Sequence, residues 1–256
     1  MFNIIYSEFI KLRKSFIFII ALIGGVLMPG VQFVGAIGTV AEHYNEIQQV
    51  SIEPFLKSYI GNIEVMSFQF TYIIIFSLIA AYIFSREFTD KTSNILYTYP
   101  ISKIKIFIGK FITIYILILF VYIIQFITTY LSLYIAWGEL PSAEFISNDM
   151  KVNLYSVLLQ FLLIPIPVLI ANITKNIIFP IVYGVLGAVI EMLLMGITIK
   201  GSIYGQFCPL LLPSLPFYHY HMGDPIDFVI TSGSAVITFG VFMFLCIYHC
   251  SNADIN

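Results

Sequence analysis

The sequence predicts an all-α polytopic membrane protein with six transmembrane helices, on the evidence of its composition and of six apolar stretches. Hydrophobic residues make up 59% of the 256 positions and charged residues only 10%, whereas a soluble domain has about 25% charged residues. A soluble fold of this length could not bury so much apolar surface, because its exterior must stay wet. Lipid is therefore the expected solvent for most of the chain.

The predicted spans cover approximately residues 16–38, 66–84, 106–136, 154–173, 177–199 and 228–248, within a single transmembrane domain of residues 1–256. Each is long enough to cross the hydrocarbon core, which takes about 20 helical residues. The third exceeds that length, so we expect tilt or an interfacial extension. Pro165 and Pro167 interrupt the fourth. The stretches are continuously apolar, whereas a barrel strand alternates, so strands are excluded as spans.

The segment before the first span is amphipathic. Its apolar residues recur at helical spacing, which predicts a helix lying in the membrane interface; they are Phe2, Ile5, Tyr6, Phe9 and Leu12. The alternative is a plain basic flank that only sets orientation. A cleaved signal peptide is disfavoured, because the apolar run that follows is longer than the usual 7–15 residues. We expect an interfacial helix followed by an uncleaved span.

Basic residues predict the orientation. If the N-terminus is cytoplasmic, nine lie inside and three outside. The inside residues are Lys11, Arg13, Lys14, Arg86, Lys91, Lys103, Lys105, Lys110 and Lys175, and the outside residues are Lys57, Lys151 and Lys200. Cytoplasmic loops carry an excess of Lys and Arg, and six spans return the chain to its starting side. We therefore expect both termini in the cytoplasm, with acidic residues such as Glu64 and Asp149 in the outer loops.

Most catalytic signatures are absent. No HExxH, GxSxG or CxxC motif occurs, so the usual metalloprotease, hydrolase and thiol-redox sites lack their residues. A phosphate-binding Walker A loop is also missing, since Gly109-Lys110 is followed by Phe111 and has Ile104 at the upstream glycine position. We expect no enzyme and no cofactor on this chain. If ATP drives a process here, another polypeptide binds it.

Three polar residues stand out within the spans. Glu191 is the one acidic residue inside a predicted span, and a carboxylate in hydrocarbon is costly unless it faces protein or water. It is therefore a candidate for a substrate path, with a structural hydrogen bond as the alternative. Gln125 and Gln160 are weaker candidates of the same kind, because amides often join helices.

A loop before the last span contains several possible metal ligands, namely His219, His221, Asp224 and Asp227. Such residues can hold a divalent ion in principle. The same segment is rich in turn-forming residues, however, and a hydrated loop explains its composition. We therefore predict no metal site.

The segment between the second and third spans is dense in charges of both signs, with Phe88 as an apolar residue among them and Pro100 ending any helix shortly before it. A short charged helix with an aromatic anchor is suited to docking on another protein. The alternative is a solvated loop.

Here the chain resembles a family. The run Arg86-Glu87-Phe88, Asp90-Lys91-Thr92, Leu96, Pro100 and Ser102-Lys103 is similar to the cytoplasmic signature of type-2 ABC transporter permeases. The N-terminal run from Tyr6 to Lys14 resembles their entry helix, most of all in the branch of bacitracin-export and lantibiotic-immunity permeases of Gram-positive bacteria. Similarity of residues is confined to about the first 110 positions. The chain has Lys91-Thr92 where many members have Gly-Thr.

The resemblance implies a dimer, with the same or a sister permease, that binds two copies of a cytoplasmic ABC ATPase carrying ATP and Mg²⁺. The segment after the second span would be the coupling helix, and its ATPase-contacting residues would be Arg86, Glu87, Phe88, Asp90, Lys91 and Thr92. The resemblance also implies a re-entrant outer hairpin before the last span. The proline-broken apolar stretch from Phe207 to Phe217 is its counterpart here, too short and broken to cross the bilayer.

The implied function is that of a permease subunit in a bacterial cell membrane. An ATP-driven exporter of this kind would remove an amphiphilic peptide antibiotic from the membrane, giving resistance or immunity. Its expected partners are the ATPase, a second permease, lipid and the peptide, with no nucleic acid. An alternative is a membrane sensor or scaffold that partners a signalling protein without transport. An intramembrane enzyme using Glu191 is disfavoured, because no paired catalytic group is in sight.

Overall fold

A computed structural model describes residues 2–13, 15–47, 53–90, 101–198 and 203–252. Every regular element in these ranges is a helix. The elements are α1 (Phe2–Arg13), α2 (Ile17–Ile47), α3 (Glu53–Met66), η1 (Ser67–Thr71), α4 (Tyr72–Thr89), α6 (Lys103–Trp137), α7 (Ala143–Leu163), α8 (Pro165–Thr174), α9 (Ile178–Thr198), η2 (Ile203–Phe207), α10 (Leu215–Met222) and α11 (Phe228–Asn252).

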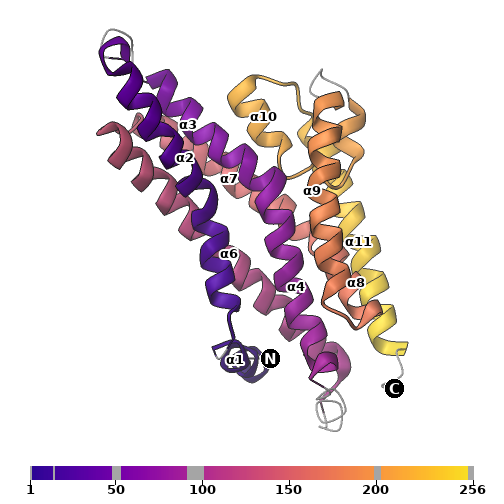
Figure 1. The fold of residues 1–256 in the computed structure, drawn as a ribbon. Coiled ribbons are helices and arrows are strands. Elements are labelled where there is room, and N and C mark those ends of the chain that lie inside the picture. Colours follow the sequence, from indigo (N-terminus) through magenta and orange to yellow (C-terminus); the bar gives the residue numbers. More distant parts are fainter. Residues whose placement is uncertain (1, 14, 48–52, 91–100, 199–202, 253–256) are drawn as a thin grey trace.

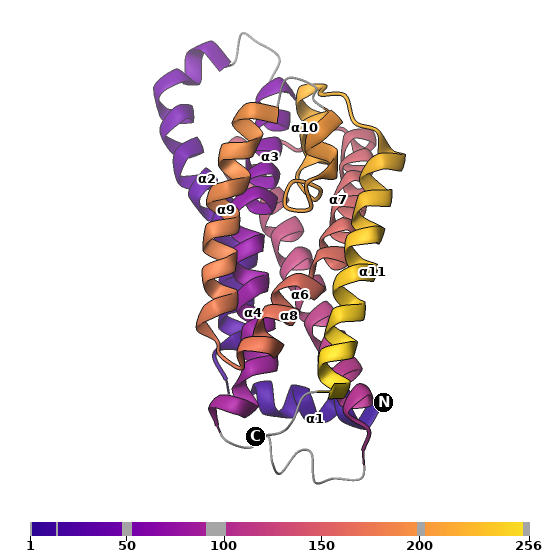
Figure 2. The same ribbon diagram turned by 90° about the vertical axis from the view of Figure 1, so that its right-hand side faces the viewer.

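Six helical segments are long and apolar enough to cross a membrane, which confirms the predicted fold class. They are Ile17–Gly38, Glu53–Thr89, Lys103–Trp137, Ala143–Thr174, Ile178–Met195 and Phe228–Asn252. Figures 1 and 2 show them as one elongated bundle. The helix α1 lies across one end, where α11 also ends, and α10 lies at the other (Figure 2). We name these the α1 end and the α10 end.

Residues 39–65 separate the first two predicted spans and are expected to form an outer loop. The described residues of this range, 39–47 and 53–65, are helical instead, which corrects the prediction. The helix α2 continues to Ile47, and α3 begins at Glu53 and runs without a break through η1 into α4. Leu56, Ile60 and Ile63 of α3 are buried in a cluster with Leu133 and Phe145. Hydropathy marks only apolar runs, whereas here a mixed sequence stays helical because one of its faces packs on neighbouring helices.

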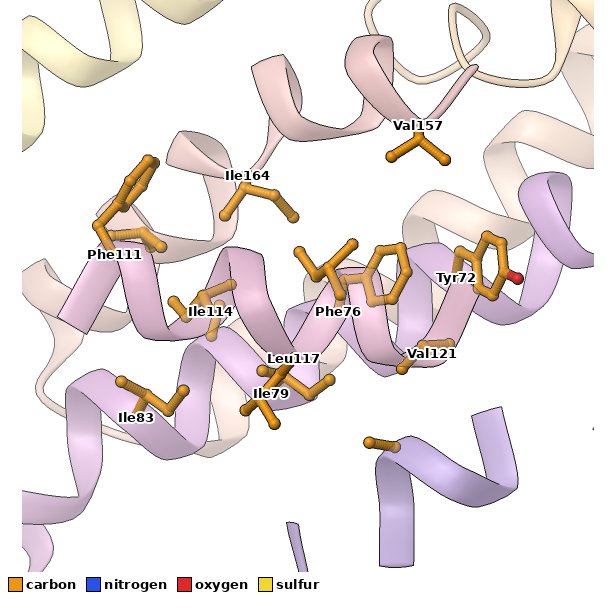
Figure 3. Packing of buried hydrophobic residues seen from close by; sticks show 14 of the residues in the cluster. Tyr72, Phe76, Ile79, Ile83, Phe111, Ile114, Leu117, Val121, Val157 and Ile164 are labelled. Carbon is orange, nitrogen blue, oxygen red and sulfur yellow. The ribbon is translucent and has the colours of Figure 1, made fainter. Parts of the chain in front are cut away.

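The core of the bundle lies between α4 and α6 (Figure 3). Four residues of α4 at helical spacing face four of α6, and Val157 and Ile164 cover them from the next segment along the chain. The α4 residues are Tyr72, Phe76, Ile79 and Ile83, and the α6 residues are Phe111, Ile114, Leu117 and Val121. Around this pair, α2 packs along α6 and α9 packs along α4. The two central helices are thus joined through these large buried side chains.

The chain between α9 and α11 enters the bundle from the α10 end and returns to it (Figure 2). It descends through η2, turns over residues 208–214, and comes back as α10. Leu211, Leu212 and Ser214 in the turn are buried. This arrangement agrees with the re-entrant hairpin that the resemblance implied.

The continuous helix from Glu53 to Thr89 contains one π-helical segment, η1. Such segments are rare and concentrate at functional positions. Phe68 and Gln69 of η1 are buried, and Gln69 accepts a 3.1 Å hydrogen bond from the hydroxyl of Tyr218 on α10. The irregular turn therefore faces the re-entrant hairpin.

Candidate functional site

The predicted ATPase-coupling residues lie where α4 ends, at the α1 end of the bundle. Arg86, Glu87 and Phe88 form the last turn of α4, and Asp90 is its C-cap, with its backbone N–H donating to the Arg86 carbonyl at 2.8 Å. Lys91 and Thr92, with most of the predicted coupling helix, lie outside the described residues. The structure therefore gives the surroundings of four of the six predicted residues.

Glu87 belongs to a network of four alternating charges from three helices. Its Oε1 accepts from the Lys11 ammonium of α1 at 2.8 Å, and its Oε2 lies 2.9 Å from the Lys110 ammonium of α6. Glu8 of α1 closes the network, 2.7 Å from Lys11 and 3.9 Å from Lys110. The two carboxylates balance the two ammonium groups, so the network carries no formal net charge.

Three of the four side chains are almost completely buried. Glu8, Glu87 and Lys110 are 6%, 10% and 5% exposed, whereas Lys11 is 39% exposed. Lys110 also donates a 2.9 Å hydrogen bond to the Ile83 carbonyl of α4. Removing one partner of a buried pair leaves an uncompensated charge and costs about 3–5 kcal/mol. The network consequently ties α1 and α6 to the last turns of α4.

Lys11 and Glu8 are on α1, which lies outside the membrane-spanning segments. Burial lowers the pKa of Lys11, but its hydrogen bonds to Glu8 and Glu87 and their negative charges outweigh burial and raise that pKa. The ammonium form is thus favoured. The Lys11 ammonium group joins α1 to α4 through its contact with Glu87.

The remaining residues of the turn are more accessible. Arg86 donates from Nη1 to the Lys11 carbonyl at 3.2 Å and from Nε to Asp90 Oδ2 at 3.2 Å. Phe88 is half-buried, with the Lys175 ammonium 5.4 Å from its ring centroid, and Asp90 is exposed. Phe88 and Asp90 thus present a surface at the α1 end, while Glu87 lies beneath it and holds the turn in place.

The substrate-path candidates are only partly brought together. Glu191 of α9 is buried and accepts a 2.7 Å hydrogen bond from the hydroxyl of Ser214 in the re-entrant turn. Glu191 and Gln160 line the same cavity of about 20 Å³ between α4, α7, α9 and the turn, room for about one water molecule. Gln125 is buried on α6 and does not line this cavity. A structural role for Glu191, one of the alternatives from the sequence, accounts for its hydrogen bond.

The acidic residues of the membrane segments are more numerous than the sequence indicated. Glu64 and Asp149, expected in outer loops, are buried at 2% and 0% exposure within helical segments that reach the α10 end. His221 faces them, whereas Asp227 caps α11 by accepting from the backbone N–H groups of Val229 and Ile230. The four possible metal ligands of the loop are therefore not brought together as one set.

The sequence also missed the roles of Glu8 and Lys110. The available signals were a Glu8–Lys11 pair three residues apart and a lysine within the apolar run of the third span. Neither signal identifies its partner, because Lys11 and Glu87 are 76 positions apart. Only the packing of α1 against α6 and α4 shows that the charges meet.

The family model described as "ABC-2 family transporter protein" matches residues 4–191, most of the chain. The chain belongs to the ABC-2 transporter family. The match includes α1, the charged network, the end of α4 and Glu191. No curated protein matches the chain. The ABC-2 assignment confirms the resemblance to type-2 ABC permeases at the level of the family.

Membership of the ABC-2 family gives the chain its general role. It is a multi-pass membrane protein and the membrane subunit of an ABC transporter, a transport subunit that is not itself catalytic. The family implies an ABC ATPase as its partner.

Proposed function

We propose that this chain is the permease subunit of an ATP-driven exporter that removes an amphiphilic peptide antibiotic, of the bacitracin or lantibiotic kind, from the membrane. The observation that carries the proposal is the buried network of Glu8, Lys11, Glu87 and Lys110 directly beneath the exposed end of α4. A partner that moves this end would move α1, α4 and α6 together.

In this mechanism, two ATPase subunits bind ATP and Mg²⁺ and contact a permease dimer through the segment that begins at Arg86. Phe88 and Asp90 would contact the ATPase directly, together with Lys91 and Thr92, and Glu87 would act by positioning them. A conformational change requires a ligand that binds two states with different affinity, and nucleotide-dependent docking of the ATPase supplies that difference.

The membrane-facing surface supports an amphiphilic cargo. Large apolar side chains are exposed along α2, α9 and α11, including Val34, Leu193 and Phe244. A peptide antibiotic that partitions into lipid can reach such a surface without crossing water. The orientation we propose places the α1 end, with both termini, in the cytoplasm of a bacterial cell membrane. The α10 end then faces the side from which the antibiotic arrives.

The proposal is tested by co-expressing the chain with its candidate ATPase, purifying the complex, and measuring ATP hydrolysis in vesicles with and without bacitracin or nisin. Phe88→Ala is expected to lower co-purification and to abolish peptide-stimulated hydrolysis, because it removes the apolar contact at the end of α4. Tyr248→Ala, an exposed aromatic on α11, is the control. The same variants are compared for resistance in cells.

Unchanged ATPase binding and resistance in Phe88→Ala would refute the assignment of the coupling surface. A complex that binds the ATPase but neither hydrolyses ATP in response to peptide nor confers resistance would instead favour the sensor or scaffold. The proposed orientation has a separate test. A reporter fused after Asn256 is expected to be active only in the cytoplasm, and activity outside the cell would contradict it.

A further inference from the structure

Three side chains able to bind a metal ion meet at the α10 end of the bundle. Glu64 of α3, Asp149 of α7 and His221 of α10 each offer a ligand atom, and these atoms all lie within 4.8 Å of one another. The three residues are far apart in the sequence and come from three different helices. This is the one such group of three or more among the described residues.

The electrostatics of the group require either a bound cation or a shared proton. Glu64 and Asp149 are two buried carboxylates side by side, and two such groups cannot both ionise unless a cation or a proton balances them. Among the described residues, the ion pair of Glu64 is with His221, and no Lys or Arg pairs with either carboxylate. The described lysines and arginines therefore leave the negative charge of this pair unbalanced.

Asp149 gives a second, independent indication of a ligand. Its Oδ2 accepts a 2.6 Å hydrogen bond from the Tyr130 hydroxyl. Its Oδ1 is buried and accepts no hydrogen bond from a donor group among the residues that the structure describes, and the Asp149 carboxyl group lies directly beside that of Glu64. A buried carboxylate oxygen without a partner loses its hydration without compensation, so a ligand at this oxygen would remove a specific cost.

His221 is held with Nε2 toward the carboxylates, 2.9 Å from Glu64 Oε2. Its ring packs so closely on Gly61 of α3 that a Cβ there would approach the ring to 2.9 Å, and it lies parallel to Phe217 at 8°. These contacts hold the ring in place beside the two carboxylates.

Each carboxylate is also oriented by a neighbour. The Asn153 amide donates to Glu64 Oε1 and is itself held by a 3.1 Å hydrogen bond to the backbone carbonyl of Asp149, whereas the Asp149 carboxylate accepts from Tyr130. Hydrogen bonds from neighbours to ligating carboxylates are typical of metal sites, where they fix the orientation of the ligands. Ligand atoms about 2.1 Å from a tetrahedral ion lie about 3.4 Å apart, which is within the range of separations that this group shows.

We propose that Glu64, Asp149 and His221 bind a divalent transition-metal ion of the Zn²⁺ class, which joins α3, α7 and α10 at the α10 end of the bundle. The donor set supports this class, since two carboxylate oxygens with one imidazole nitrogen suit Zn²⁺ better than Ca²⁺ or Mg²⁺, which take oxygen ligands. The ion neutralises the carboxylates. It also fixes the re-entrant hairpin to the long helix that begins at Glu53 and ends at Thr89.

The test uses the full chain, purified in detergent without a polyhistidine tag and stripped with a chelator. Zn²⁺ alone is added, bound zinc is measured by elemental analysis, and affinity is obtained by competition with a zinc-binding dye. We expect about one Zn²⁺ per chain. His221→Gln and Asp149→Asn should each weaken binding at least about 100-fold, since losing even a hydrogen-bond partner of a ligand costs about 10–100-fold.

The matched control is His219→Gln. His219 is on the same helix but is exposed, with its ring nitrogen 2.6 Å from the Asp224 carbonyl, so this change should leave zinc binding unaltered. Gly61→Ala should weaken binding without removing a ligand, because it displaces the His221 ring.

Two results would overturn the proposal. One is equal zinc loss in His219→Gln and His221→Gln. The other is a folded wild-type chain that binds no zinc. Stabilisation by Glu64→Gln would then indicate that the carboxylates share a proton instead. If the ligand variants fail to fold, the wild-type chain is loaded with Co²⁺ and its visible spectrum is measured. A tetrahedral site gives strong visible absorption of Co²⁺. A spectrum without this absorption, in a chain that also binds no zinc, would refute the site.

Discussion

Replacing Lys110 by Met tests whether the buried network holds α1, α4 and α6 together. The change keeps an unbranched apolar side chain, one atom shorter than lysine, and removes its charge. It deletes the 2.9 Å pair with Glu87, the 3.9 Å pair with Glu8, and the hydrogen bond to the Ile83 carbonyl. Two buried carboxylates are then left to share Lys11.

The expected cost is about 3 kcal/mol, the lower end of the range for a broken buried pair, because Lys11 still neutralises part of the charge. Lys11→Met is the comparison. The Lys11 side chain is 39% exposed, and Lys110 still pairs with Glu87 in that variant. Solvent-screened pairs are worth about 1 kcal/mol or less, so we expect a clearly smaller loss.

The assay is unfolding of the full chain in detergent micelles by a denaturing detergent, followed by circular dichroism. A double variant, Lys110→Met with Glu87→Gln, completes the cycle. Removing both charges leaves no uncompensated ion, so the double variant should be about 2 kcal/mol less destabilised than the sum of the single changes, as contacting residues are not additive. Strict additivity, or a loss in Lys11→Met as large as in Lys110→Met, would refute the network.

Three further predictions concern other parts of the bundle. Gly184→Ala should lower the stability of the fold by about 1–3 kcal/mol, because the new Cβ would lie 2.9 Å from the backbone of α4. The same change at Gly240, where a Cβ meets open space, should leave the thermal unfolding midpoint unchanged or raise it. Ser214→Ala should cost about 1–2 kcal/mol, since it leaves Glu191 buried without its hydrogen bond, and an unchanged midpoint would contradict this. The lowered pKa of His221 means that the unfolded state takes up a proton first. Stability in chelator should therefore fall as pH drops below about 6.5, and His221→Gln should lose that dependence.

The six spans were predictable because hydrophobicity over about 20 residues decides whether a helix crosses lipid. The amphipathic α1 was predictable for a similar reason, since its pattern is local. The full length of the second span could not be predicted in this way. Residues 53–65 contain Glu53, Lys57 and Glu64, and their helix is stabilised by contacts with residues from α6, α7 and α10 that no local pattern reveals.

Two charged residues of the continuous helix from Glu53 to Thr89, Glu64 of α3 and Glu87 of α4, show the same limit. The sequence marked Glu87 by its resemblance to a family signature, but the resemblance assigned it an outward contact, whereas the structure turns it inward toward Lys11 and Lys110. The hydropathy pattern assigned Glu64 to an outer loop, because residues 39–65 form the polar segment between the first two predicted spans. A buried carboxylate is recognised by its partners, and these come from distant parts of the chain.

Glu64 and Glu87 lie on one continuous helical rod, 23 positions apart, which corresponds to about 35 Å along the axis. At one end the rod is bound to α1 and α6 by the charged network, and at the other it contacts α7 and α10 through Asn153 and His221. Only the π-helical turn η1 interrupts its regularity, and η1 contacts the re-entrant hairpin through Gln69. On the proposed mechanism, a tilt imposed at Glu87 displaces Glu64 unless η1 absorbs it. In this mechanism, the long helix is the physical connection between the end of α4 and the re-entrant hairpin.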